Sequence, residues 1–121
     1  MRKEKINKLI EAWKDDKDVL DIIQTDVLAL GEYTQAVYYM EFSVAIIKAK
    51  YEGEEVRDAL GKNDQSRHDA HERAIMGVKR LNRFASMKGL EPIFEGDIDN
   101  RYEVADFCCA TVKEYFDNRT L

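Results

Sequence analysis

The residues best suited to chemistry lie in one short stretch, SRHDAHERAI at residues 66–75. This stretch holds both histidines of the chain, His68 and His71. Imidazole side chains change charge near neutral pH and bind transition metals, so two of them among acids and arginines could form a catalytic or metal site. The alternative is the polar end of a structural helix. The surrounding pattern favours this structural interpretation.

The spacing around the two histidines gives little support to a metal site. They can share a helical face, but neither an HExxH motif nor a Glu-x-x-His pair accompanies them. Asp69 follows His68 as in the HD phosphohydrolases, but those enzymes need a further histidine upstream and this chain has none. We therefore expect neither a metal nor a cofactor, and we expect His68 to face solvent.

Two carboxylate pairs have the spacing by which all-α nucleotide pyrophosphohydrolases hold Mg²⁺. Glu52 and Glu55 form an ExxE pair, and Glu103 and Asp106 form an ExxD pair. The pairs are far apart in sequence and are expected at opposite ends of an antiparallel bundle. Because 24 of the 121 residues are acidic, such pairs also arise by chance. A nucleotide-hydrolase-like activity is therefore the weaker alternative.

A polar cluster at one end of the bundle is the better candidate site. Helical spacing places Arg67 in line with the apolar stripe of its helix and His71 on the flank of that stripe. Glu55 and Asp58 continue the stripe of the preceding helix, and Asp64 lies in between. If the two helices pack antiparallel, these side chains meet, and a buried charge without a partner costs several kcal/mol, roughly 3–5. We predict that Arg67 and His71 point inward and pair with Glu55 or Asp58.

Lys79, Arg80 and Arg83 form a basic group on the predicted outward face of the same helix. Nucleic-acid binding needs clustered Lys and Arg to neutralise phosphates. Asp69 and Glu72 dilute this group, and the whole chain has a formal net charge of −5 and a pI near 5.1. A solvated helix face is the favoured interpretation, with nucleic acid as the alternative.

These side chains have to be positioned by helices. The chain is 45% hydrophobic and 36% charged, with one proline and six glycines. Few chain breakers and apolar residues at 3–4 spacing predict an all-α bundle of four or five helices, a single domain over residues 1–121. The predicted helices cover residues 3–30, 32–60, 64–88 and 100–118.

Short polar or glycine-containing stretches set the predicted boundaries. KDDKD at 14–18 is either a break or a polar stretch inside one long first helix. Gly31 is a predicted helix stop, Gly53 is a possible interruption, and LGKND at 60–64 is a predicted loop. Gly89 is expected to end the third long helix in the left-handed conformation.

The segment before the last helix also has readable signals. Asn100 and Glu103 have the spacing of a capping box at the start of that helix. Ile93 and Phe94, in the preceding loop, are expected to cover an edge of the core.

The predicted helix 32–60 is apolar on two faces. A helix of this kind has a central position or an unpartnered face, which predicts self-association. One stripe contains Val37, Met40, Val44, Ile47 and Tyr51, and the other contains Tyr38, Phe42, Ala45 and Ala49.

The cysteines and the N-terminal segment bear on location. Cys108 and Cys109 are adjacent, so on a helix they cannot form an ordinary disulfide with each other, and reduced thiols are expected. No apolar run approaches the roughly 20 residues that span a bilayer, and MRKEKINKLIEAW lacks the features of a signal peptide. We expect a cytoplasmic protein without a membrane partner.

The second half of the chain contains the spaced run Asp64, Arg67, His71 and Ile75, followed by four motifs: LNRFA at 81–85, GLEPIF at 89–94, GD at 96–97 and RYEVADF at 101–107. With these motifs taken together, roughly residues 60–119 resemble a family of small uncharacterised helical proteins, a domain of unknown function from Firmicutes and their phages or integrative elements. The resemblance implies an intracellular helical protein and brings no mechanism. The polar positions that it implies are Arg67, His71, Asn82, Asp97 and Arg101.

Two hypotheses about function follow. The first is a small non-enzymatic interaction or accessory protein that binds itself or another protein. The second is an enzyme or small-ligand binder that uses the polar cluster around Arg67 and His71. A concave pocket with convergent polar groups would support the second, whereas mutually satisfied pairs would support the first.

Overall fold

The protein is built from helices alone within the described part of the chain. The computed structural model describes residues 2–116. It contains α1 (Arg2–Ala12), α2 (Lys17–Tyr38), α3 (Met40–Lys50), α4 (Glu54–Met87) and α5 (Arg101–Phe116). The predicted all-α fold is confirmed. No described helix is long and apolar enough to cross a membrane.

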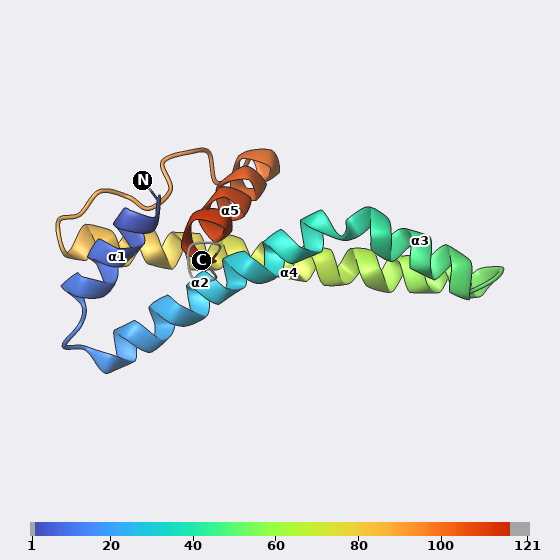
Figure 1. Ribbon diagram of the computed structural model, residues 1–121, viewed down its shortest axis with the longest axis horizontal. Helices are drawn as coiled ribbons and strands as arrows, with labels where there is room; N and C mark the ends of the chain where they lie inside the picture. The colour runs from blue at the N-terminus through green and yellow to red at the C-terminus, as the bar shows by residue number, and fades with distance from the viewer. Residues whose placement is uncertain (1, 117–121) are drawn as a thin grey trace.

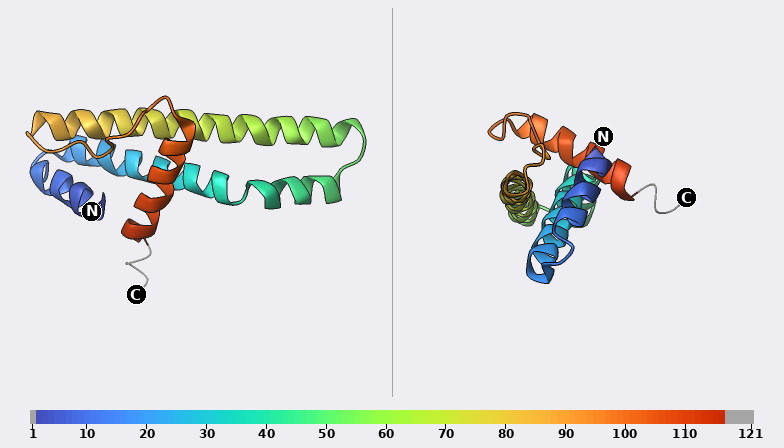
Figure 2. Two further views of the ribbon diagram at one scale, coloured as in Figure 1. Left: turned by 90° about the horizontal axis from the view of Figure 1, so that it is seen from above. Right: turned by 90° about the vertical axis from the view of Figure 1, so that its left-hand side faces the viewer.

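The long helix α4 forms the backbone of an elongated molecule (Figure 1). Helix α2 runs antiparallel to the C-terminal half of α4, and α1 and α5 pack at this end to form the part that we call the body. Helix α3 continues from α2 and runs beside the N-terminal part of α4, residues 54–66. These two segments form a two-helix arm that projects from the body (Figure 2).

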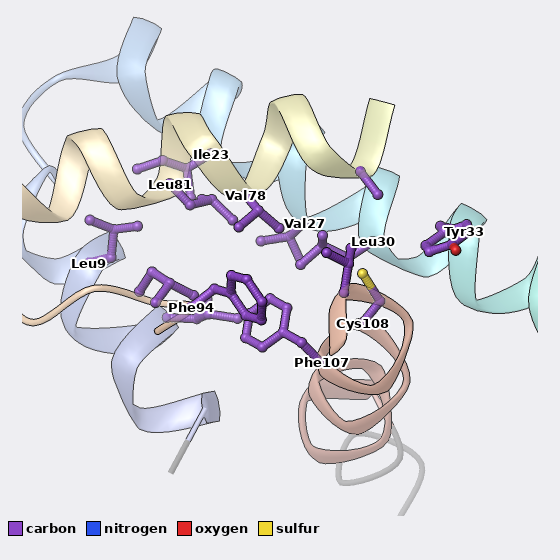
Figure 3. Close-up of a cluster of buried hydrophobic side chains, with 14 of the residues drawn as sticks. Leu9, Ile23, Val27, Leu30, Tyr33, Val78, Leu81, Phe94, Phe107 and Cys108 are labelled. Atoms are coloured by element: carbon purple, nitrogen blue, oxygen red, sulfur yellow. The ribbon is translucent and has the colours of Figure 1, made fainter. Parts of the chain in front are cut away.

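The core lies in the body, where regular spacing brings apolar side chains onto facing stripes. Ile23 and Leu30 on α2 and Val78 and Leu81 on α4 are fully buried (Figure 3). The predicted apolar stripe of the third helix is therefore confirmed. α1 and α5 complete the core, to which they contribute Ile6, Leu9, Val104, Phe107 and Cys108.

The loop between α4 and α5 closes the core as expected. Ile93 and Phe94 are buried, and the Phe94 ring lies 5.0 Å from the Phe107 ring, centroid to centroid, in a tilted arrangement (Figure 3). Asn82 holds this loop, because its Oδ1 accepts hydrogen bonds from the amides of Ile93 (2.8 Å) and Phe94 (3.1 Å) and its Nδ2 donates to the carbonyl of Phe94 (3.0 Å).

The first long helix of the prediction is in fact two helices. Residues 13–16 break it, and Asp16 caps α2 by accepting a hydrogen bond from the amide of Val19 at 3.2 Å. The predicted stop at Gly31 is wrong, since α2 continues to Tyr38. Tyr33 is buried beyond the glycine, and such packing outweighs the roughly 1 kcal/mol that glycine costs inside a helix.

The predicted continuous helix 32–60 and the loop at 60–64 are wrong, whereas the possible interruption at Gly53 is confirmed. The helix is interrupted at Tyr39 and again at residues 51–53, where Gly53 adopts a positive φ of 60° and reverses the chain. Residues 54–64 then belong to α4. Val56, Ala59 and Leu60 are half-buried in the arm, which explains why a stretch of weak helix formers is helical here.

The C-terminal boundary of α4 and the start of α5 follow their sequence signals. Gly89 has a φ of 68°, and the amide of Leu90 donates to the carbonyl of Ala85 at 2.9 Å. Asn100 caps α5 by accepting from the amide of Glu103 at 3.3 Å. The second half of the predicted capping box is absent, because the Glu103 carboxylate instead accepts from the amide of Asp97.

Candidate functional site

The expected polar cluster does not form as predicted. Glu55 and Asp58 lie on α4 itself, N-terminal to Arg67 and His71, and both are exposed. A rise of 1.5 Å per residue separates Glu55 from Arg67 by about 18 Å along the helix. The predicted pairing is wrong because it assigned these acids to the preceding helix.

Arg67 finds its partners closer by. Its Nη2 lies 3.1 Å from Oδ1 of Asp64, one turn earlier on α4, and its Nη1 donates to the sulfur of Met40 at the start of α3. The side chain is half-buried at the base of the arm. Arg67 therefore links α4 to α3, with Asp64 as its only acidic partner among the described side chains of residues 3–113.

His71 points into the junction of α2, α4 and α5. Its side chain is 15% exposed, and its ring packs against Tyr33 of α2 with 5.1 Å between centroids. Nδ1 is 3.9 Å from Oε1 of Glu72, too far for a hydrogen bond, and Nε2 is buried with no hydrogen-bond partner within the described part of the chain. His68 is 62% exposed. The predicted orientation of both histidines is confirmed, although not the acidic partners of His71.

This junction shifts the pKa of both of its titratable rings. Burial lowers the pKa of His71, the charge of Arg101 lowers it further, and Glu72 partly opposes the change. Burial raises the pKa of Tyr33, against the effects of Arg101 and Arg67. His71 is thus neutral at pH 7, and the charge of Arg101 acts on both rings. Tyr33 was not among the predicted candidates, although its position three residues after Leu30 continues the buried stripe of α2.

A second polar pair joins α2 and α4 in the body. Asp26 is 1% exposed, and its carboxylate accepts two hydrogen bonds from Nε of Arg80, at 3.2 and 3.1 Å, and one from Nη2 at 2.6 Å. The hydrogen bond to Asp26 raises the pKa of Arg80. The assignment of Arg80 to a solvated basic face is therefore wrong, whereas Lys79 and Arg83 are exposed.

A glycine allows the helices to approach at this pair. A Cβ atom placed on Gly77 of α4 would lie 3.3 Å from Cβ of Asp26 and 3.4 Å from its carbonyl oxygen. The close approach brings Asp26 within reach of Arg80, three residues further along α4. Each charge satisfies the other, which is the arrangement of a structural clamp.

The weaker candidates have local contacts. Asn82 holds the 93–94 loop, as described above. Asp97 accepts a hydrogen bond from the amide of Asp99 at 3.0 Å within the turn that leads into α5. Arg101, the first residue of α5, is exposed and acts on His71 and Tyr33 through its charge. The structure thus brings Arg101 and Arg67 near His71, but not Asn82 or Asp97.

A groove of about 760 Å³ lies at the base of the arm, where α2 gives way to α3. Arg73, on one side, has its Nε 3.6 Å from Oε2 of Glu32. Both arginines of the groove, Arg67 and Arg73, therefore have acidic neighbours. The lining mixes polar and aromatic groups, among them Gln35, Tyr39, Phe42, Ser43, Asn63 and Arg67.

Beyond the groove, the arm exposes apolar side chains. α3 contains no buried residue, and Phe42, which also lines the groove, is 64% exposed. Val44 and Ile47 are half-buried on the side of α3 toward α4. We call the opposite side of α3 the outer face. It consists of Phe42, Ala45, Ile46 and Ala49, all exposed. Tyr38, which the sequence placed in the same stripe, is the last residue of α2 and is also exposed.

The described residues include no group of three or more His, Cys, Asp or Glu side chains placed to hold a metal ion. The features that remain as candidates are a mixed groove, a half-buried histidine and an exposed apolar face.

Comparison with known proteins adds a family. Neither a curated protein nor a solved structure matches the chain. The family described as "Protein of unknown function (DUF3232)" matches residues 1–121, so the match extends well beyond the second half, in which the sequence suggested a family of this kind. The chain belongs to this uncharacterised family.

Proposed function

We propose that this protein is a small non-enzymatic helical interaction protein that self-associates through the outer face of α3. The observation that carries the proposal is a helix of 11 residues without a buried side chain that presents Phe42 and Ile46 to solvent. Exposed apolar side chains grouped on one face are typical of protein–protein contacts.

Energetics support a partner for this face. Isolated helices shorter than about 12–15 residues are marginal in water, and most helices in proteins depend on packing of an apolar face. α3 packs only its half-buried side against α4. Covering a side chain of the size of Phe42 or Ile46 contributes about 1.5–3 kcal/mol. A partner on the outer face would therefore stabilise the arm as well as bind it.

The polar groups also support a non-enzymatic role. Asp26 is held by Arg80, and Asn82 by the backbone of the 93–94 loop. Arg67 pairs with Asp64, and Arg73 lies next to Glu32. These side chains serve contacts between and within helices.

A cytoplasmic bacterial location belongs to the same proposal. The two cysteines are free, and burial raises the pKa of Cys108 to about 12, which leaves its thiol protonated and unreactive. Free thiols are typical of reducing compartments.

Sedimentation velocity of the full chain over a range of concentrations tests the proposal. We expect a concentration-dependent dimer for the parent and a monomer for Phe42→Asp. Met87→Asp is the matched control, because Met87 is 63% exposed at the far end of α4 and should leave the dimer intact. A parent that sediments as a 14.1 kDa monomer at every concentration would contradict the proposal.

Binding of a small polar ligand in the groove is the second candidate. The observation that favours it is the volume of about 760 Å³ beside Arg67, Ser43 and Asn63. Native mass spectrometry of the purified protein would show a bound small molecule of defined mass that disappears in Arg67→Ala. A spectrum that contains only the polypeptide, together with a concentration-dependent dimer, would favour self-association.

A further inference from the structure

The charges of α3 are ordered along one flank of the outer face. Glu41 and Lys48 are seven residues apart, so at about 100° per residue they lie within about 20° of each other around the helix. Both are exposed, and neither has an ion-pair partner among the described side chains of residues 3–113. Lys50 lies on the other flank. One flank thus carries an acid near the body and a base near the tip of the arm.

This order distinguishes the two ways in which two copies of α3 can pair around a two-fold axis. In a parallel pair, the flank with Glu41 and Lys48 meets the opposite flank of the second copy, which has no acid. In an antiparallel pair, the same flank of both copies comes together with its order reversed. Each Glu41 then lies opposite Lys48 of the second copy, and two ion pairs form.

Side-chain sizes on the outer face favour the register in which Glu41 lies opposite Lys48 of the second copy. Pairing Glu41 with Lys48 places the two-fold axis midway between Val44 and Ala45. Phe42 is then level with the gap between Ala45 and Ala49 of the second copy, where two small side chains leave room for the ring. Knobs that insert between residues of the facing helix are the packing mode of paired helices. Charge and size are independent observations, and they agree.

We infer that two copies of this chain pair antiparallel through the outer faces of α3, with each Phe42 inserted between Ala45 and Ala49 of the other copy and with two Glu41–Lys48 ion pairs at the flanks. The inference rests on the proposed self-association and adds to it the partner's orientation and register. The arm is free for this contact, since no other described helix lies over it (Figures 1 and 2).

Charge exchange tests the arrangement by sedimentation at low ionic strength. Glu41→Lys gives a flank with two bases, and Lys48→Glu gives a flank with two acids. Each variant alone turns two attractive pairs into two repulsive ones, so we expect its dimer to weaken on the order of tenfold. An equimolar mixture of the two variants should form a mixed dimer at least as stable as the parent, and the double variant should recover self-association.

Lys50→Glu is the matched control, because it makes the same charge change on the same helix but on the other flank. Its dimer should stay within about twofold of the parent, and raising the salt should reduce all the differences. The mixed dimer is the decisive species, because a contact between Glu41 and Lys48 within one chain would be restored in the double variant but not by mixing.

The outcomes separate the inference from the proposed function. A monomeric parent, or a dimer that survives Phe42→Asp, overturns both. A second outcome separates the two. If Phe42→Asp disrupts the dimer, the outer face remains the interface. If, in addition, Glu41→Lys and Lys48→Glu each associate as tightly as the parent, or fail to form the mixed dimer, the antiparallel arrangement is overturned. Circular dichroism shows whether a single variant loses helicity. A variant that weakens its own dimer only by unfolding of the arm would also fail to form the mixed dimer, because the mixed dimer requires two folded arms.

Discussion

At the scale of single residues, the Asp26–Arg80 pair is the strongest polar contact between α2 and α4. Removing one partner of a buried pair strands the other charge, which costs about 3–5 kcal/mol. Because the Arg80 side chain is 40% exposed, we expect Arg80→Ala to lower the free energy of unfolding by about 3 kcal/mol, at the low end of that range. Urea unfolding measures this loss. Lys79→Ala, at the exposed neighbouring position, should change stability by less than about 0.5 kcal/mol, and an equal effect of both variants would contradict the clamp.

His71 makes stability depend on pH. Its pKa is lowered from the ordinary 6.5 by burial and Arg101, so the folded state binds the proton less tightly than the unfolded state. The resulting stability is fully present above about pH 6.5 and is lost as the pH falls toward the lowered pKa. We expect parent protein to lose more stability between pH 7.5 and 5.5 than His71→Gln does, as measured by urea unfolding at each pH. His68→Gln should keep most of the parent's pH dependence, because His68 is the smallest of the influences on the His71 pKa. The same loss in His71→Gln would show that another group is responsible.

The candidate residues show how far sequence reasoning reaches at this scale. The orientation of His71 and His68 followed from the helical register alone. The pairing of Asp26 with Arg80 did not, because the residues are 54 positions apart and only the relative placement of two helices brings them together. The signal was an acid next to Ile23 and Val27 in an apolar stripe, which needed a partner from elsewhere.

At the scale of elements, glycine decides how the arm is built. The sequence predicted the α4 C-terminus and the cap of α5, where local hydrogen bonds set the boundary. It misplaced the boundary between the second and third predicted helices, because LGKND reads as a loop, while packing against α3 makes it helical. Gly53 makes the turn instead, with a backbone conformation that favours glycine.

Two glycines of the arm should therefore respond in opposite ways to the same substitution. Gly53→Ala places a Cβ at a φ of 60°, and we expect it to destabilise the arm by about 1–2 kcal/mol. Gly61→Ala lies within α4 with no atom within 4 Å of the added Cβ, and should stabilise it by about 0.5–1 kcal/mol. Thermal unfolding followed by circular dichroism compares the two. A destabilising Gly61→Ala would show that residues 60–64 form the loop that the sequence suggested.

At the scale of the whole molecule, the chain combines a body with a core and an arm without one. Periodicity predicted the all-helical body, because its stripes are long and its buried residues lie at regular spacing. The two apolar stripes of the helix 32–60 region predicted either a central helix or an unpartnered face. The central position is wrong for α3, which contains no buried residue, and its outer face is exposed. The projection of the arm was not predictable, since it depends on the break at Tyr39 and on the length of α4.

This division predicts two levels of protection against amide hydrogen exchange. Amides of α4 near Val78 and Leu81 lie over the core and should exchange only through global unfolding. Amides of α3 lie in a helix without buried side chains, so in dilute protein they should exchange faster by orders of magnitude through local opening of the arm. Raising the concentration of the parent protein should slow exchange in α3, because pairing of two copies reduces the population of the open state. In Phe42→Asp, exchange in α3 should not change with concentration. Exchange in α3 that is as slow as at Val78 in dilute protein would show that the arm is stable alone. If exchange in α3 of the parent does not depend on protein concentration, self-association does not stabilise the arm.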